Sequence, residues 1–300
     1  MKYFLKSVAL FALVVVSIVA TLILLSDCAV KSRKQLLLKV DDNIKFVFSG
    51  DSHMECSVND ELIDHSINIA QSGEAYLYSY AKIRSLLECN DQIKTVFIGF
   101  SYGDLLKDKE ISWLFGKMSV EEYIENYNYI LSSSDKSLIF KHNPKAYIKG
   151  LAKSVFPNFT AFIKSLSPEK SGKSRLSNYG GYMYLVRDKL QEDIEMIDTY
   201  TKEPLIVSHF QEQYLMKLSQ LCRQKSVRLI LLNTPKYALY NENVNQEIRQ
   251  NWISFREKLK GDSLLDFSDM VLPDSCYGDM THLNYRGAEL FSLNLNDLLN

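Results

Sequence analysis

Short apolar runs alternate with amphipathic stretches at both ends of the chain, and no other feature of the sequence constrains its fold as much. The expected strands cover residues 44–48, 66–70, 94–100, 227–232 and 264–267. The expected helices cover residues 75–87, 208–224 and 245–259 and the end of the chain from about residue 285. Strands that alternate with helices form parallel sheets, so the sequence predicts an α/β fold with about five parallel strands.

The middle of the chain does not follow this alternation. From about residue 105 to 202 it is rich in Ser, Lys and Tyr, with turn signals at Asn143-Pro144, Phe156-Pro157 and Gly180-Gly181. We expect a mainly helical insertion whose aromatic side chains fill a small core of their own. A cleft for sugars lined by the same tyrosines is the alternative.

The amino terminus predicts a membrane anchor. Residues 7–26 carry no charge, and about 20 residues at about 1.5 Å each span a bilayer core of about 30 Å. The run is longer than the apolar part of most cleaved signal peptides, which is the competing interpretation, and lipidation at Cys28 is a third. Lysines and arginines flank both ends, so charge leaves the orientation open. The predicted parts are an anchor (1–30), a stalk (31–43) and an α/β domain (44–300).

Charge and cysteine content exclude several classes of function. With 35 basic and 36 acidic residues, the chain has no excess positive charge for a nucleic-acid partner. The five cysteines lack the spacing of a zinc site or a redox pair, so we expect neither a metal nor another cofactor. Disulfides among four of them and buried free thiols both remain open.

Two short motifs contain the residue types of a serine nucleophile and its base. Gly50-Asp51-Ser52-His53 follows the first expected strand, and Asp279-Met280-Thr281-His282 precedes the last expected helix. An alcohol nucleophile needs a base to take its proton, and the base needs a partner that fixes its tautomer. Three residues separate Asp279 from His282, so the carboxylate can reach one ring nitrogen while the other faces Ser52.

These two motifs resemble the first and last conserved blocks of the SGNH, or GDSL, hydrolases, over about residues 44–104 and 205–300. The resemblance implies a three-layer α/β/α arrangement of the flavodoxin-like kind. It also implies that Ser52 is the nucleophile, His282 the general base and acid, and Asp279 the orienting carboxylate. For Asp51 we expect a role in tying down the turn, and for His53 a hydrogen bond in that turn rather than direct catalysis.

The two middle blocks of the family give the expected oxyanion hole. Gly73 fits the second block, so the backbone N–H groups of Ser52 and Gly73 are expected to hold the oxyanion. The third block departs from the family, because Gly99-Phe100-Ser101 stands where the family has an Asn. Its donor is then the Ser101 hydroxyl, or the hole has two donors only.

Gly-Asp-Ser-His is similar to the SGNH domains attached to bacterial membrane acyltransferases that modify cell-surface polysaccharides. This implies a catalytic domain outside the cytoplasmic membrane and a serine esterase or O-acyltransferase. The implied substrate is an acyl ester of envelope carbohydrate or lipid, with acetyl as the expected acyl group, and a membrane acyltransferase is the implied partner. A non-catalytic carbohydrate-binding or assembly subunit is the alternative, and a phospholipase or thioesterase would use the same triad.

Overall fold

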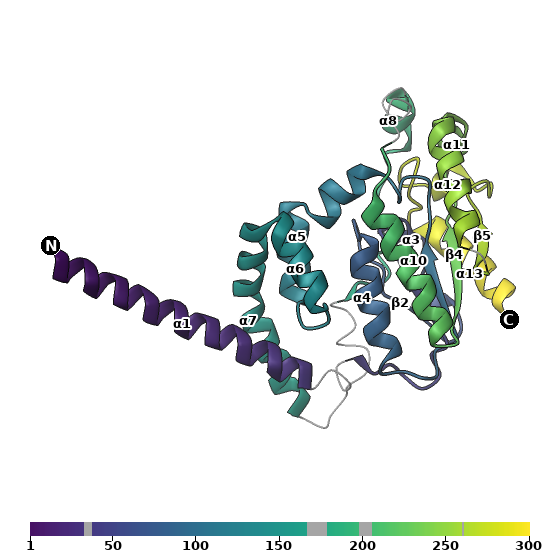
Figure 1. Cartoon of the computed structure of the whole chain (residues 1–300). Helices are drawn as coiled ribbons and strands as arrows, with labels where there is room; N and C mark the ends of the chain where they lie inside the picture. Colours follow the sequence, from purple (N-terminus) through teal and green to yellow (C-terminus); the bar gives the residue numbers. More distant parts are fainter. Residues whose placement is uncertain (33–37, 167–178, 198–205, 260) are drawn as a thin grey trace.

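The computed structural model describes residues 1–32, 38–166, 179–197, 206–259 and 261–300. Five parallel strands form one sheet in the order β2-β1-β3-β4-β5 (Figure 1). The strands are β1 (Phe46–Ser49), β2 (Ser66–Asn68), β3 (Thr95–Gly99), β4 (Arg228–Asn233) and β5 (Ser263–Asp266). The predicted α/β fold with a five-stranded parallel sheet is therefore confirmed.

Helices cover both faces of this sheet, because alternate residues of each strand point to opposite sides. The first face carries Val96 and Ile98 of β3, and its core includes side chains of α4 (Tyr76–Leu87), α10 (His209–Gln224) and α12 (Gln246–Lys258). The second face carries Phe97 of β3, and its core includes α3 (Ser52–Ser57) and α13 (Tyr285–Leu299). The short α11 (Ala238–Asn243) follows β4, and α8 (Leu190–Glu195) precedes α10.

Within residues 105–202, the described part is mainly helical. A π-helix (Lys109–Leu114) leads into α5 (Lys117–Tyr127), α6 (Ser133–His142) and α7 (Pro144–Leu166). Helix α7 packs against both α5 and α6. We call residues 179–189 the return strap. This segment contacts the loop after β2 and helix α3, because Gly181 N–H donates to Ala70 O and Met183 N–H donates to Glu55 O.

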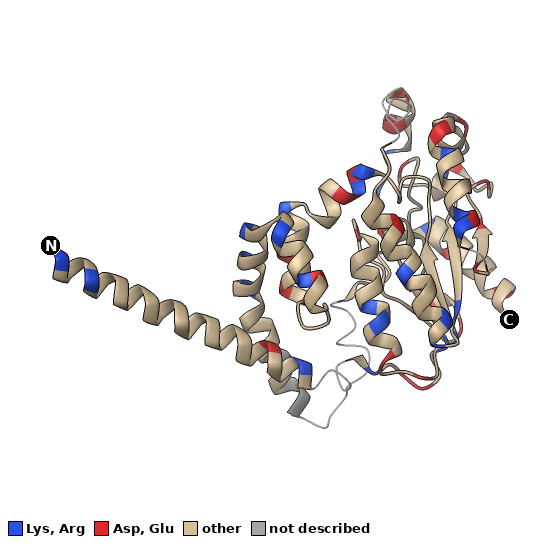
Figure 2. Cartoon of the chain, viewed as in Figure 1, with Lys and Arg blue, Asp and Glu red and all other residues tan. Residues whose placement is uncertain are grey.

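The amino terminus forms α1 (Lys2–Ser32), a helix that is long and apolar enough to cross a membrane. Figure 2 shows that it carries charged residues only near its two ends. Its last turns contact the helical part, where Ser26 and Val30 are buried and Asp27 accepts a hydrogen bond of 2.9 Å from Asn128. All five cysteines are free, so the disulfide alternative is not realised.

Candidate active site

The turn after β1 places Ser52 at the carboxyl edge of the sheet. Gly50 adopts φ of 145°, and a Cβ there would lie 2.8 Å from Met54 Cγ and 3.1 Å from Gly99 N. Only glycine fits this close approach of two strand ends. Asp51 then caps α3 by accepting the His53 N–H at 3.0 Å, so Ser52 is the first residue of the helix.

The loop before α13 brings the second motif to the same edge. His282 Nε2 lies 2.8 Å from Ser52 Oγ, and His282 Nδ1 lies 2.9 Å from Asp279 Oδ1. The backbone N–H groups of Thr281 and His282 also donate to Asp279 Oδ1, at 2.9 and 2.8 Å. These bonds fold the four-residue motif into a tight turn. The three side chains therefore stand in line, with the imidazole between the hydroxyl and the carboxylate.

Asp279 is held in its ionised form. Burial alone would raise the pKa of this carboxyl, but the hydrogen bond and charge of His282, the Thr281 N–H and the guanidinium of Arg187 outweigh burial. The pKa therefore lies well below its ordinary value. An ionised Asp279 stabilises a positive charge on His282, which is the charge that a general base acquires when it takes the proton of Ser52.

Arg187 was not predicted, because it belongs to the return strap within the expected insertion. Its guanidinium pairs with Asp279 Oδ2. The strap is fixed on either side of Arg187, because Lys189 N–H donates to Gly278 O at 2.8 Å and Tyr285 N–H donates to Leu185 O at 3.0 Å. No local sequence signal places this arginine beside a carboxylate 92 residues away.

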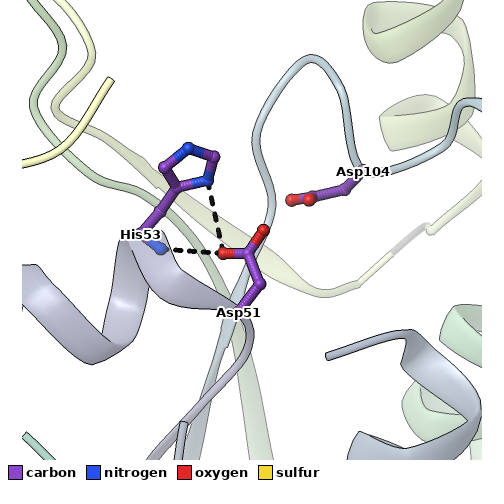
Figure 3. Close-up of side chains that lie close together, drawn as sticks. All are labelled: Asp51, His53 and Asp104. Atoms are coloured by element: carbon purple, nitrogen blue, oxygen red, sulfur yellow. Dashed lines mark hydrogen bonds and ion pairs between the residues drawn. The ribbon is translucent and has the colours of Figure 1, made fainter. Parts of the chain in front are cut away.

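A buried group of charges lies behind the nucleophile turn. Figure 3 shows Asp51 beside both His53 and Asp104, and the ammonium of Lys109 contacts both carboxylates. Burial and the charge of Asp51 raise the pKa of Asp104 to about 6. For Asp51, burial acts in the same direction, but His53 and Lys109 outweigh it and lower the pKa. The ammonium therefore holds two buried carboxylates together.

The same group contains the three side chains best placed to hold a metal ion in the described part of the chain. Potential ligand atoms of Asp51, His53 and Asp104 all lie within 4.8 Å of one another. Lys109 already supplies a positive charge between the two carboxylates, with Nζ 3.4 Å from Asp104 Oδ1. A cation at this place would have to compete with that ammonium, so the donor set is a poor fit for a metal.

His53 lies against the candidate base. The rings of His53 and His282 stack with centroids 4.8 Å apart. Burial lowers the pKa of His53 to about 4, with Lys236 adding to this effect and Asp51 opposing it. His53 is therefore neutral at pH 7 and places no second positive charge beside His282.

Lys236 is a second residue that the sequence reasoning missed. It follows Asn233-Thr234-Pro235 at the end of β4 and is 2% exposed. Nζ donates to Thr281 O at 2.9 Å and to Thr234 Oγ1 at 3.3 Å. Burial lowers its pKa to about 8, while nearby carboxylates including Asp51 oppose this. Lys236 thus ties the loop of Asp279 and His282 to the end of β4.

The two further positions expected in the oxyanion hole have different surroundings. Gly73 is buried with φ of 69°, and a Cβ there would lie 2.0 Å from the Trp113 ring. Both donors of Ser101 are directed at Asp104 Oδ2, the backbone N–H at 2.6 Å and the hydroxyl at 3.1 Å. The Ser101 hydroxyl therefore donates its hydrogen bond to Asp104. The sequence predicts a different role for it, as a donor in the oxyanion hole.

Two cavities flank the nucleophile helix. One of about 190 Å³ is lined by His53 and Thr281 and by apolar side chains that include Tyr102, Tyr240 and Ile248. A larger one of about 590 Å³ lies between α3, α5 and the return strap. Its lining includes Glu55, Gln71, Glu122, Asn126 and Tyr182. The first has a mixed lining that also includes Asn243 and Asn245, and the second carries mainly hydrogen-bonding groups.

Comparison with known proteins leaves the family open. A family model for a domain of unknown function matches residues 188–300. No curated protein matches the chain. Among solved structures, the chain is similar to one described as "a putative platelet activating factor from Streptococcus pneumonia", with 14% identity over 96% of this chain and 99% of that one. The TM-score of 0.40 is too low to establish a common fold.

Proposed function

We propose that this protein is a membrane-anchored serine esterase or O-acyltransferase of the SGNH type. The observation that carries the proposal is the continuous relay from Ser52 Oγ through His282 to Asp279, with distances of 2.8 and 2.9 Å. Helices on both faces of a parallel sheet support the three-layer arrangement of that family. The long apolar α1 supports an anchor. The resemblance to SGNH domains of membrane acyltransferases is the reason to place the catalytic domain outside the cytoplasmic membrane.

In the proposed reaction, Ser52 Oγ attacks the carbonyl carbon of an ester while its proton passes to His282 Nε2. Asp279 stabilises the imidazolium, and the oxyanion accepts hydrogen bonds from the backbone N–H groups of Ser52 and Gly73. His282 then gives the proton to the oxygen of the leaving alcohol. The alcohol departs, and the acyl group stays on Ser52. Water or a sugar hydroxyl then attacks this acyl group and loses its proton to His282. The bond between the acyl group and Ser52 Oγ breaks, His282 returns the proton to Oγ, and the free acid or the acylated sugar leaves.

The cavity beside His53 favours a short acyl group. Its volume of about 190 Å³ suits an acetyl ester better than a long lipid chain. The larger polar cavity suits the hydroxyl-bearing part of the ester, because carboxylates and amides accept hydrogen bonds from hydroxyl groups. An acetylated envelope carbohydrate therefore fits both cavities.

Acetyl transfer tests the proposal directly. The full chain in detergent is given 4-nitrophenyl acetate, first in water alone and then with a sugar alcohol present. We expect nitrophenol release that Ser52→Ala abolishes, and acetylated sugar alcohol identified by mass spectrometry if the protein is a transferase. Equal release from wild type and Ser52→Ala would contradict the proposal.

One observation favours a second candidate, a carbohydrate-binding or assembly subunit of a membrane acyltransferase complex. Both donors of Ser101 are taken by Asp104, which leaves a hole of two donors where catalytic members of the resembling family have more. Cells that carry Ser52→Ala separate the candidates. A subunit that only binds keeps its cellular role, whereas the proposed enzyme loses it.

A further inference from the structure

Helix α7 carries an apolar stripe that no described residue covers. Ile148, Ala152, Phe156, Phe159 and Ile163 follow one another at intervals of four, four, three and four residues. This spacing places them on one face of the helix. All five are exposed, and Phe156 and Phe159 expose 78% and 58% of their surface. Such a row of large apolar side chains in water marks an interaction surface.

The other side of α7 already packs against the protein. A Cβ on Gly150 would lie 2.7 Å from Glu121 O and 2.8 Å from Ile124 Cβ, so the absence of a side chain lets α5 approach closely. Ser154 and Asn158 are also buried. Tyr147 and Leu151 of α7 also pack on the core of the domain. The helix therefore carries apolar side chains on two sides, one against the domain and one exposed.

Helix α1 indicates what covers the stripe. Its apolar side chains from Tyr3 to Leu25 are exposed, and burial begins at Ser26. The helix is joined to the domain at that level, where Asp27 accepts from Asn128 and pairs with Lys136 at 3.3 Å. Helix α7 contacts α1 directly, and Figure 1 shows it as the outermost helix of the globular part on the side from which α1 projects.

We propose that α7 lies in the surface of the membrane that α1 crosses, with the Ile148–Ile163 stripe buried at the boundary of headgroups and acyl chains. The occupant of the stripe is therefore lipid, and the surface is continuous with that of α1. Lys145 is exposed at the amino-terminal end of α7, where its long side chain can extend to a lipid phosphate, whereas the neighbouring Lys149 pairs with Glu121 at 2.8 Å.

The inference rests on α1 being an inserted anchor, as the proposed function requires. Its consequence concerns the position of the domain relative to the bilayer. With two helices in contact with the bilayer, the height and tilt of the domain are fixed more firmly than by α1 alone. The site at Ser52 is then held in a fixed position relative to the membrane surface.

Photolabelling by lipid tests this placement. The full-length protein is reconstituted into phosphatidylglycerol–phosphatidylethanolamine vesicles that contain a small fraction of phospholipid with a diazirine near the headgroup end of its acyl chain. After illumination, mass spectrometry locates the labelled peptides. We expect labels in α1 and in α7 around Phe156 and Phe159. The exposed Ile253 on α12, at the opposite side of the globular part, is the internal control and stays unlabelled.

The double variant Phe156→Ser/Phe159→Ser sharpens the test, since both side chains are exposed and their loss does not disturb the core. It should lose the label in α7 and keep the label in α1. Labelling of α1 with none in α7, or equal labelling of α7 and α12, would overturn the inference and leave the anchor intact. Absence of label from α1 would overturn both the anchor and the placement of α7.

Discussion

The guanidinium of Arg187 pairs with Asp279 Oδ2, the carboxylate whose other oxygen lies 2.9 Å from His282 Nδ1. Arg187 comes from the return strap, and Asp279 comes from the loop before the last helix. The strap therefore helps to set the orientation of the candidate base, although it lies outside both motifs that resemble the hydrolases.

Arg187→Gln should lower kcat only modestly. The Arg187 side chain is 40% exposed, so solvent screens the pair and we expect a loss of up to about fivefold. Asp279→Asn should cost about 10⁴-fold, because it removes the charge that stabilises the imidazolium and favours the wrong tautomer. Arg223→Gln removes an exposed arginine that faces Asp262 and is the matched control. Equal losses from Arg187→Gln and Asp279→Asn would show that Arg187 itself takes part in the chemistry.

The two stacked histidines should differ sharply in their effect on turnover. His282→Ala removes the only side chain within hydrogen-bonding distance of Ser52 Oγ among the described residues and should lower kcat by about 10⁴-fold. His53→Ala removes a neutral ring and should leave much of the activity. Steady-state hydrolysis of a small acetyl ester measures both. A loss of the same size in the two variants would move His53 into the mechanism.

Acid should destabilise the folded protein partly through His53. Between pH 6.5 and 4 the unfolded His53 binds a proton that the folded one does not, because burial lowers its folded-state pKa to about 4. Its contribution to the free energy of unfolding therefore falls as the pH falls through this window, by about 3 kcal/mol at most.

This acid dependence is measured by thermal unfolding of the full chain in detergent at several pH values. His53→Ala should flatten the dependence between pH 6.5 and 4. The same substitution at His209, which is exposed at the start of α10, serves as the control. If wild type and His53→Ala lose stability in parallel, the ring is not buried in its neutral form.

Lys236→Met should weaken turnover through the loop that carries Asp279 and His282. The substitution keeps most of the side-chain volume but leaves Thr281 O without its 2.9 Å hydrogen bond. The carbonyl is partly buried, and leaving it unpaired costs on the order of 1 kcal/mol, so we expect kcat to fall up to about tenfold while KM for a small ester stays unchanged. Thr234→Val removes the longer bond of Lys236 and is the control. An increase in KM alone would assign Lys236 to substrate binding instead.

The sheet could be predicted because its signals are local. β3, for example, is a run of β-branched and aromatic residues bounded by turn residues, and the observed Thr95–Gly99 lies within the predicted residues 94–100. Ser52, Asp279 and His282 could be named because their two short motifs resemble the first and last conserved blocks of the SGNH hydrolases. The structure brings both motifs to the carboxyl edge of the sheet.

The supporting residues could not be predicted, because their contacts depend on packing over long distances along the chain. Arg187 reaches Asp279 only because the strap returns over the sheet, where Tyr179 O accepts a hydrogen bond from the buried Lys82. Ser101 was expected to donate to the oxyanion, but the spacing to Asp104 does not reveal that the carboxylate takes both donors. Helix α3 also begins at Ser52 itself, and only the cap by Asp51 hints at this.

Reaction with a fluorophosphonate probe tests the central claim most directly, because the probe bonds only to a serine that a neighbouring base activates. The full-length protein is labelled in detergent, digested and analysed by mass spectrometry, beside Ser52→Ala and His282→Ala. The account predicts one modified residue, Ser52, with no label in the first variant and very little in the second. Folded wild-type protein that stays unlabelled, or a label on a different serine, would contradict it.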